Sequence, residues 1–204
     1  MKTKNKCALI IKLEFSKAFD RVNWYFLRLI LLQIGVPLVG VNWIMGCLSS
    51  ANFALLVNDT SSSFFPTSKG IRQGCPLSPL LFILVIEGLS LLIEDARTNG
   101  RIKGIIISPQ LSLIHLLFVD DVILFDTGTF EEWVDFKVIL DNFCAASGMC
   151  INMDKSYFLF NNVEEGILNR ISHSLSFKYD HISLGFKYLG YFINPLGYLV
   201  KDWH

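Results

Sequence analysis

The chain has few charged residues and no excess of either sign. Its 204 residues include 18 Lys and Arg and 18 Asp and Glu, so the formal net charge is zero. A protein that binds nucleic acid is expected to be basic, and this balance argues mildly against that class. The 52% hydrophobic and 13% aromatic content excludes a disordered chain and is enough for the core of about one domain.

The sequence also lacks a disulfide framework and a zinc motif. Its five cysteines are widely spread without a C-x-x-C pair, and its four histidines are not spaced for zinc. This pattern is typical of free thiols in a reducing compartment. The apolar run near the N-terminus stops at Lys12 and Glu14 without a small-residue cleavage site, so no signal peptide is predicted.

No apolar run reaches the roughly 18 to 20 residues that a membrane-spanning helix needs. The longest run, 79–93, contains Glu87, and a second run, 25–48, contains Arg28 and Pro37. Buried helices explain both runs. We therefore predict no membrane partner, and an unrelated helical membrane protein is a minor alternative.

Strand and helix signals alternate along the chain. A Thr129–Glu132 capping box starts one helix, and Ser78 as N-cap with Pro79 behind it starts another. This order predicts an α+β fold, in which an antiparallel sheet has helices packed on one face. Helices are expected at about 23–35, 39–49, 78–99 and 129–148, and strands at about 7–15, 53–59, 62–70, 102–108, 111–119, 122–126, 156–160 and 186–193.

An Asp-Asp pair interrupts the apolar segment 116–125. Adjacent carboxylates repel each other unless a cation neutralises them, and oxygen ligands suit Mg²⁺ or Mn²⁺. Because successive strand residues point to opposite faces, we expect Asp120 to face a shared site and Asp121 to reach it only if the chain turns there. The alternative is an acidic turn on a solvated hairpin.

A second acidic segment follows the first predicted strand. A carboxylate at the end of a buried strand is costly unless it is paired or bound to a metal. Glu14 is therefore either a metal ligand or an exposed strand end. Asp20 is expected to pair with Arg21 or to cap a helix.

The segment 69–82 combines two glycines with positive charge ahead of a helix. Gly70 and Gly74 let the backbone pass close to another group. Lys69 and Arg72, next to the positive end of the helix dipole, suit a phosphate or a nucleic-acid backbone. A tight loop before a helix is the alternative.

Taken in order, the motifs resemble those of non-LTR (LINE-type) retrotransposon reverse transcriptases, especially plant ones. The matching segments span about residues 10–193 and read SKAFDRVNW, IRQGCPLSP, LLFVDDVILF, ASGMCIN with KS after it, and FKYLGYFI. The resemblance implies a reverse transcriptase palm with a ferredoxin-like core. It implies an RNA-directed DNA polymerase, which joins dNTPs to a DNA primer on an RNA template by two-metal phosphoryl transfer. Cytoplasmic or nuclear action is implied as well.

The same resemblance assigns the catalytic residues. Glu14, Asp120 and Asp121 would hold two Mg²⁺ (or Mn²⁺) ions, together with the backbone carbonyl of Phe15. Lys155 would protonate the leaving pyrophosphate.

Nucleotide and template contacts are implied at other motif positions. Phe19 would pack under the sugar and exclude a 2′ hydroxyl. Arg72, Gln73 and Gly74 would lie along the template and the incoming nucleotide. The segment 186–193 would form a primer-grip-like hairpin.

The chain departs from the family pattern at Glu14, where the family has Asp. The extra methylene moves the carboxylate by on the order of 1.5 Å, whereas productive geometry tolerates about 0.5 Å. We therefore expect severely reduced or absent activity with Mg²⁺. A catalytically inactive remnant that binds nucleic acid weakly is the alternative function. Cys75 in place of Asp, and Val119 in place of Ala, are expected to be tolerated variants.

The resemblance also predicts the domain organisation. We expect residues 1–204 to form a single, partial palm, with fingers and thumb largely missing and no endonuclease or RNase H segment. Basic fingers and thumb elsewhere in a parent polyprotein would account for the zero net charge of this part.

Overall fold

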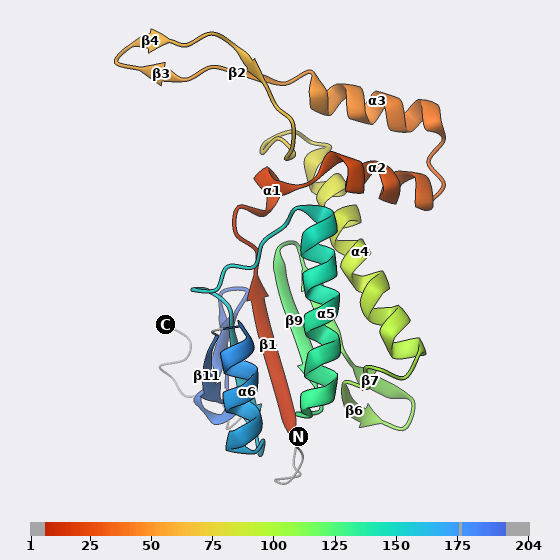
Figure 1. Ribbon diagram of the computed structural model, residues 1–204, viewed down its shortest axis with the longest axis vertical. Helices are drawn as coiled ribbons and strands as arrows, with labels where there is room; N and C mark the ends of the chain where they lie inside the picture. The colour runs from red at the N-terminus through yellow and green to blue at the C-terminus, as the bar shows by residue number, and fades with distance from the viewer. Residues whose placement is uncertain (1–6, 176, 195–204) are drawn as a thin grey trace.

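The computed structural model describes residues 7–175 and 177–194. Its centre is a five-stranded sheet in the order β11–β10–β1–β9–β8, with β1 in the middle (Figure 1). Neighbouring strands are antiparallel except β10 and β11, which are parallel, so the antiparallel prediction is wrong at that edge. The strands are β1 (Ala8–Glu14), β8 (His115–Phe118), β9 (Asp121–Asp126), β10 (Tyr157–Asn161) and β11 (Lys178–His181).

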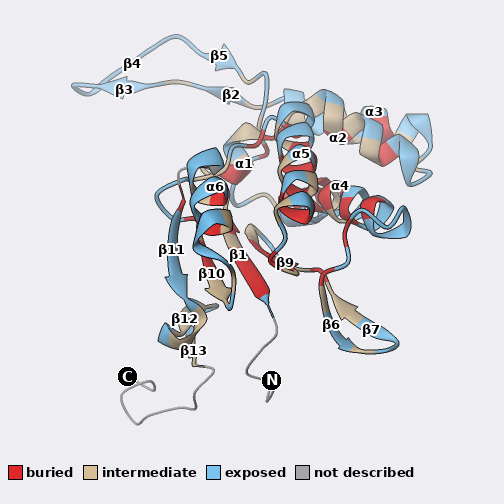
Figure 2. Ribbon diagram, turned by 60° about the horizontal axis from the view of Figure 1, so that its bottom comes forward, coloured by how far each residue is buried: buried red, intermediate tan, exposed pale blue. Residues whose placement is uncertain are grey.

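Helices cover one face of this sheet, as predicted. The buried sides of these helices face the sheet, and their outer sides are exposed (Figure 2). Leu9, Ile11 and Leu13 of β1 alternate toward this side and join a core that includes Trp133 and Phe143. The helices are α4 (Ser78–Thr98), α5 (Phe130–Ser147) and α6 (Glu165–Leu175).

The opposite face of the sheet carries a smaller apolar cluster. Ile10, Ile123 and Leu159 form part of it, and Phe186 and Tyr188 pack against it. The last two residues belong to the hairpin of β12 (Phe186–Tyr188) and β13 (Tyr191–Ile193), which follows a short 3-10 helix, Ile182–Leu184. This face therefore lacks a helical layer where β1 ends and β9 begins.

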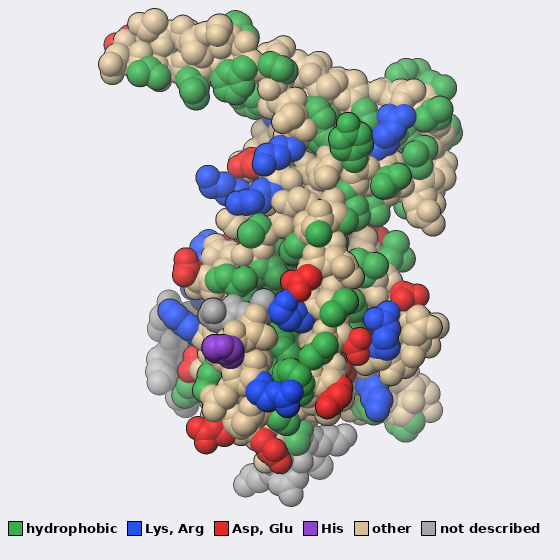
Figure 3. Space-filling model, in the orientation of Figure 1, with side chains coloured by type: hydrophobic (Ala, Val, Ile, Leu, Met, Phe, Trp, Pro, Cys, Tyr) green, Lys and Arg blue, Asp and Glu red, His purple; other side chains and the backbone are tan. Residues whose placement is uncertain are grey.

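Further elements extend from the central body. A long arm, with a turn at Asn58 and Asp59, and a short hairpin both project from it (Figures 1 and 2). On the face shown in Figure 3, Lys and Arg side chains gather where the arm joins the body. These elements are α1 (Ala18–Arg21), α2 (Trp24–Gln33), α3 (Leu38–Ser49), β2 (Asn52–Phe53), β3 (Leu56–Val57), β4 (Thr60–Ser61), β5 (Phe65–Pro66), β6 (Ile105–Ser108) and β7 (Leu111–Leu113).

The predicted helices agree with the structure in place and length, but their caps differ. Ser78 is the first residue of α4 and not its N-cap, because the residue before the helix is Leu77, which makes no side-chain cap. Thr129 does cap α5, accepting the Glu132 N–H at 3.4 Å. The Glu132 carboxylate does not complete the box; it bonds the backbone N–H groups of Lys103 and Gly104, both at 2.7 Å.

Four elements were not predicted, and the predicted strands 53–59 and 111–119 are each divided between two strands. These elements are α1, the 3-10 helix, α6 and β11. α6 buries Leu168 and Ile171 among its described side chains, and Ile167 packs against the same core. The predicted strand 111–119 is two strands, because the chain leaves the main sheet at Ile114 and β7 pairs with β6. No helix in the described part of the chain is long and apolar enough to cross a membrane.

Asp126, at the end of β9, should make the stability depend on pH. Burial raises its pKa to about 8, and the charge of Glu132 adds to the rise. Hydrogen bonds from the N–H groups of Gly128 and Thr129 lower the pKa but do not offset the rise. The folded state therefore binds a proton that the unfolded state has released, so stability falls as pH rises toward 8. The slope is about 1.4 kcal/mol per pH unit between pH 5 and 8.

Urea unfolding at pH 6 and pH 8 tests this expectation. The natural chain should lose about 2 to 3 kcal/mol over that interval. Asp126→Asn should remove most of the loss, whereas Asp141→Asn, at an exposed ion pair with Lys137, should retain it. Equal slopes in the natural chain and Asp126→Asn would contradict the assignment.

Candidate active site

Glu14 at the end of β1 lies directly opposite Asp121 at the start of β9. The Glu14 N–H donates to Ser156 Oγ at 3.1 Å, and its carbonyl accepts the Asn152 N–H at 2.8 Å. Both backbone groups thus bond on the β10 side. The two acids therefore form the closer type of antiparallel pair, whose Cα atoms are about 4.5 Å apart.

Both carboxylates project from the face of the sheet that has no helices. Their sequence neighbours Leu13 and Val122 are buried in the helix-side core. Successive residues of a strand alternate, so Glu14 and Asp121 point the other way. Their side chains are 25% and 23% exposed, respectively, and are thus open to solvent and to a ligand.

Each of these carboxylates is paired with a lysine. Lys155 Nζ lies 2.6 Å from Glu14 Oε1, and Lys12 Nζ lies 3.7 Å from Asp121 Oδ1. Like charges directly opposite each other destabilise a strand pair. The two ammonium groups offset this repulsion, and Lys12 also lies over the Tyr157 ring, 5.9 Å from its centroid.

Two of the predicted acidic residues raise the pKa of Lys155. The hydrogen bond and charge of Glu14 raise the pKa of Lys155, the charge of Asp120 adds to the rise, and desolvation opposes it. The lysine is held in a turn in which the N–H groups of Lys155 and Ser156 donate to the Asn152 carbonyl at 3.3 and 3.0 Å. The ammonium group thus stays protonated beside Glu14 and within the field of Asp120.

The Asp pair lies in a tight hairpin. Phe118 pairs with Asp121, so Val119 and Asp120 form a two-residue turn between β8 and β9. Val119 has φ 54°, which is unfavourable for a β-branched residue. The condition under which Asp121 was expected to reach the site, a turn of the chain at the Asp pair, is therefore met: Asp121 is the strand residue opposite Glu14, and Asp120 lies in the turn.

Two tyrosines beside the acids were not predicted as site residues. Burial raises the pKa of Tyr157 and of Tyr188, and the charge of Asp121 adds to both shifts. Tyr188 comes from β12, so the predicted primer-grip-like hairpin lies near the acids. Lys12 was also missed, although its spacing of two residues from Glu14 on one strand was a usable signal.

The two predicted phenylalanines are held by aromatic packing. The Phe15 side chain is buried, and its ring centroid lies 5.9 Å from that of Phe143. The Phe19 ring stacks on Phe82 of α4, with centroids 4.5 Å apart and an interplanar angle of 9°. Phe19 is half-buried, so part of its ring remains accessible beyond the strand end.

The predicted glycine-rich loop docks against α1. The Gly70 N–H donates to the Val22 carbonyl at 2.8 Å, and the Gly70 carbonyl accepts Trp24 Nε1–H at 2.6 Å. Gly70 has φ +82°, and a Cβ there would lie 2.7 Å from the Asp20 carbonyl oxygen. The predicted close approach is confirmed at Gly70, whereas a Cβ added at Gly74 would meet no described atom within 4 Å.

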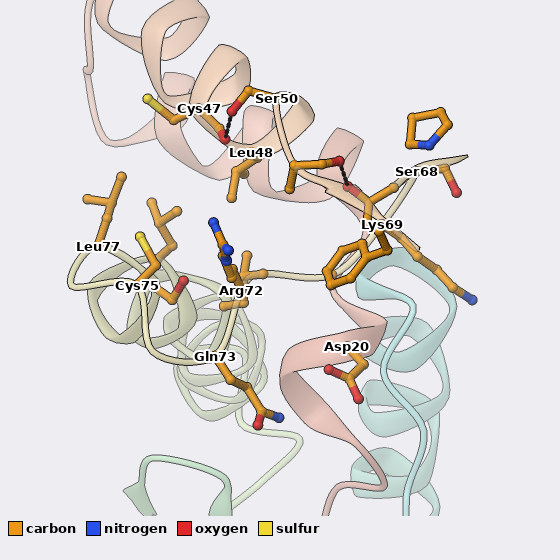
Figure 4. Close-up of a pocket in the computed structure, with 18 of the residues that line it drawn as sticks. Asp20, Cys47, Leu48, Ser50, Ser68, Lys69, Arg72, Gln73, Cys75 and Leu77 are labelled. Carbon is orange, nitrogen blue, oxygen red and sulfur yellow. Dashed lines mark hydrogen bonds between the residues drawn. The ribbon is translucent and has the colours of Figure 1, made fainter. Parts of the chain in front are cut away.

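This loop lines a cleft of about 710 Å³ between α3, the base of the arm and the start of α4. Arg72 points into the cleft and Gln73 points away from it (Figure 4). Asp20 also lines the cleft, and its predicted roles are wrong among the described contacts: it forms no ion pair with Arg21, and the α1 N-cap is Lys17. Among the described residues, no hydrogen bond or ion pair joins the cleft to the Glu14–Asp121 pair.

Within the described ranges, no three His, Cys, Asp or Glu side chains are grouped as a ready metal site. Glu14 and Asp121 instead bond lysine ammonium groups. The structure thus brings Glu14, Asp121 and Lys155 together, with Asp120 nearby. A second group consists of Phe19 in α1 and of Arg72, Gln73 and Gly74 in the loop before α4. The Ile71 N–H of this loop donates to the Phe19 carbonyl at 2.8 Å.

Comparisons with known proteins identify the family. The sequence profile described as "Reverse transcriptase (RNA-dependent DNA polymerase)" matches residues 1–193. The type-1 retrotransposable element R2 Pol polyprotein of Popillia japonica is 26% identical over 155 residues, 74% of this chain and 24% of that protein. The transposon TX1 149 kDa protein of Xenopus laevis is 28% identical over 199 residues, 94% of this chain and 14% of that protein.

Solved structures give the same fold. Apo telomerase from Candida tropicalis, truncated from its C-terminal domain, superposes with a TM-score of 0.63 at 15% identity, covering 95% of this chain and 35% of that one. Identity at this level shows the fold alone, a mixed sheet-and-helix layer like a reverse transcriptase palm. The chain spans about a quarter or less of the length of these two relatives. As its motifs predicted, the chain belongs to the reverse transcriptase family, among relatives from non-LTR retrotransposons.

Proposed function

We propose that the chain forms the palm of an RNA-directed DNA polymerase, which adds dNTPs to a DNA primer on an RNA template. The observation that carries the proposal is the convergence of Glu14, Asp121 and Lys155 on the open face of the sheet. Asp120 in the adjacent turn adds a third carboxylate. Fingers, thumb and endonuclease would come from other parts of a parent polyprotein, acting in the nucleus or cytoplasm.

The donor set fits divalent cations. Glu14, Asp120, Asp121 and the Phe15 carbonyl are hard oxygen donors of the kind that Mg²⁺ and Mn²⁺ prefer. The facing acids already require positive charge, which Lys12 and Lys155 supply. Bound ions would lower the pKa of the primer 3′ hydroxyl and neutralise the triphosphate.

Lys155 would act as the proton donor. Glu14 raises its pKa and keeps Nζ protonated, while the side chain stays exposed enough to move between partners. From this place Nζ can give a proton to the leaving pyrophosphate. Once metal ions had replaced Lys155 beside Glu14, its exposed side chain could move to the pyrophosphate and give it a proton.

The second group of residues would bind the nucleotide and template. The Phe19 ring, fixed flat on Phe82, offers an apolar platform for a sugar and limits the room for a 2′ hydroxyl. Arg72 in the cleft would contact phosphates, and Gln73 and Gly74 would lie along the bases. The β12–β13 hairpin at 186–193 would hold the primer end, since Tyr188 lies within the field of Asp121.

We also infer a ferredoxin-like core within a single palm over 1–204. The chain order β1, α4, β8, β9, α5, β10 and the sheet order β10–β1–β9–β8 support it. All neighbours among these four strands are antiparallel, and both helices lie on one face.

Binding of an RNA–DNA primer–template tests the proposed contact surface. Arg72→Ala should weaken binding about tenfold and reduce its salt dependence, because one phosphate contact is lost. Lys137→Ala, on the outer side of α5 in an ion pair with Asp141, should bind like the natural chain. Equal binding by both variants would exclude the cleft as the nucleic-acid surface.

A further inference from the structure

Cys75 lies in the turn that leads into α4, three residues before the first residue of the helix. The Ser78 N–H donates to the Cys75 carbonyl at 3.0 Å, and the Leu81 N–H donates to the Leu77 carbonyl at 3.1 Å. Pro76 follows Cys75, where a residue without an N–H suits a first helical turn. The turn therefore leads directly into the 21-residue helix, and Cys75 lies close to the first N–H groups of that helix.

The groups around Cys75 favour the thiolate form of its side chain. The Leu77 N–H lowers the pKa of the Cys75 thiol most; partial desolvation opposes it, and the hydroxyl and N–H of Ser78 and the charge of Arg72 lower it further. These groups stabilise a thiolate, and helix N-termini do so generally.

The Ser78 hydroxyl is an independent sign that this site is built for an anion. Ser78 is 1% exposed, and its Oγ has no hydrogen-bond partner among the described residues. It lines the same cleft as Cys75, three residues away along the chain. A buried hydroxyl without a partner costs on the order of 1 to 3 kcal/mol, and a thiolate acceptor would remove that cost.

The cleft around the thiol has room and charge for a small acidic adduct. Its volume of about 710 Å³ is that of a small-molecule site, and Cys75 and Arg72 both line it (Figure 4). Lys69 adds a second positive charge, against one acid, Asp20. A ligand with carboxylates therefore suits the cleft better than a neutral or cationic one.

We propose that Cys75 is a reactive thiolate and a covalent modification site, which exchanges with small acidic disulfides such as glutathione disulfide. The sulfur attacks one disulfide sulfur, the new S–S bond forms as the old one breaks, and the departing thiolate takes the electron pair and then a proton from water. The disulfide is the oxidant, so the exchange balances without another reactant. The adduct occupies the cleft beside Arg72, and the site does not depend on polymerase activity.

Competition among the chain's own thiols tests this site. The full chain is treated with limiting glutathione disulfide at pH 7, and each cysteine is followed by peptide mass spectrometry. Cys75 should be modified about tenfold faster than Cys47, which lines the same cleft and is more exposed. Modification of Cys47 and Cys150 at the same rate as Cys75 would overturn the proposal.

Two variants separate thiolate stabilisation from simple access. Ser78→Ala should slow the modification of Cys75 several-fold at pH 7 and leave it unchanged near pH 10, where the thiols ionise without help. Cys75→Asp should keep the fold, because an acidic side chain is favourable near the N-terminus of a helix, and should abolish the fast adduct. If Ser78→Ala does not fold, the pH profile of the natural chain decides: a midpoint for Cys75 no lower than that of Cys47 would overturn the proposal.

Discussion

Glu14→Asp is expected to make the stability of the chain respond to Mg²⁺, a response that the natural chain should lack. Glu14 reaches Lys155 at 2.6 Å with its longer side chain. Asp would withdraw the carboxylate by about one methylene, on the order of 1.5 Å, toward the position that near-octahedral Mg²⁺ geometry requires. At a Mg²⁺ concentration ten times the Kd, binding stabilises the folded state by about 1.4 kcal/mol. This amounts to a rise in melting temperature of roughly 2 to 4 °C.

Thermal unfolding with 0 to 10 mM MgCl₂ provides the measurement. Glu14→Asp combined with Asp121→Asn is the matched control, since it has the shorter acid but loses its cross-strand partner, and should not respond. Chelation should return the single variant to its metal-free melting temperature. A natural chain that shifts as much as Glu14→Asp would show that the extra methylene does not impair the site.

The same substitution should affect catalysis more strongly. Grafted in place of the matching segment of an active relative, the natural palm should extend a primer at least about 100-fold more slowly than the Glu14→Asp graft, because an error near 1 Å in positioning can cost that much. Full activity with Glu14, unchanged in Glu14→Asp, would contradict the expectation. Neither graft extending a primer, while both bind it, would favour the inactive-remnant alternative.

Local patterns were sufficient to predict most elements of the fold. The apolar segment around Ile11 and the acids that follow it identified β1 and its end, and Gly148, with φ 76°, ends α5 as expected. α6 was missed although Ile167, Leu168 and Ile171 recur at helical spacing and lie in or against the core. β11 pairs in parallel with β10 and is exposed along its length, which leaves no alternation to detect.

The site could be predicted in composition but not in register. Motif order placed Glu14, Asp120, Asp121 and Lys155 together, yet which aspartate faces Glu14 depends on a one-residue choice that reverses every side chain of a strand. That choice is made by the turn, in which Val119 adopts a left-handed conformation that its sequence does not favour. Cross-strand partners such as Lys12 are visible only once the register is known.

Glu132→Ala is expected to cause the largest loss of stability among single substitutions in the polar interior. Glu132 is 4% exposed, and its Oε1 accepts the N–H groups of Lys103 and Gly104, both at 2.7 Å. Its Oε2 accepts the Thr127 N–H at 3.2 Å and also bonds the Thr127 hydroxyl. The carboxylate thus ties the chain before β6 to the segment after β9, across the start of α5.

Removing this carboxylate leaves the backbone N–H groups of Lys103, Gly104 and Thr127 without their acceptor, in a region where water has little access. Breaking a buried charged network in this way costs about 3 to 5 kcal/mol, a large share of the stability of a single domain. Urea unfolding should show this loss as a lower midpoint with an unchanged slope.

Glu131→Ala, at the exposed neighbouring position, should change stability by no more than about 0.5 kcal/mol. Glu132→Gln should fall between them and should also reduce the pH dependence from Asp126, because the negative charge that helps to raise the Asp126 pKa is gone. A Glu132→Ala variant as stable as Glu131→Ala would mean that these N–H groups find other acceptors, and that the chain before β6 is not fixed by this carboxylate.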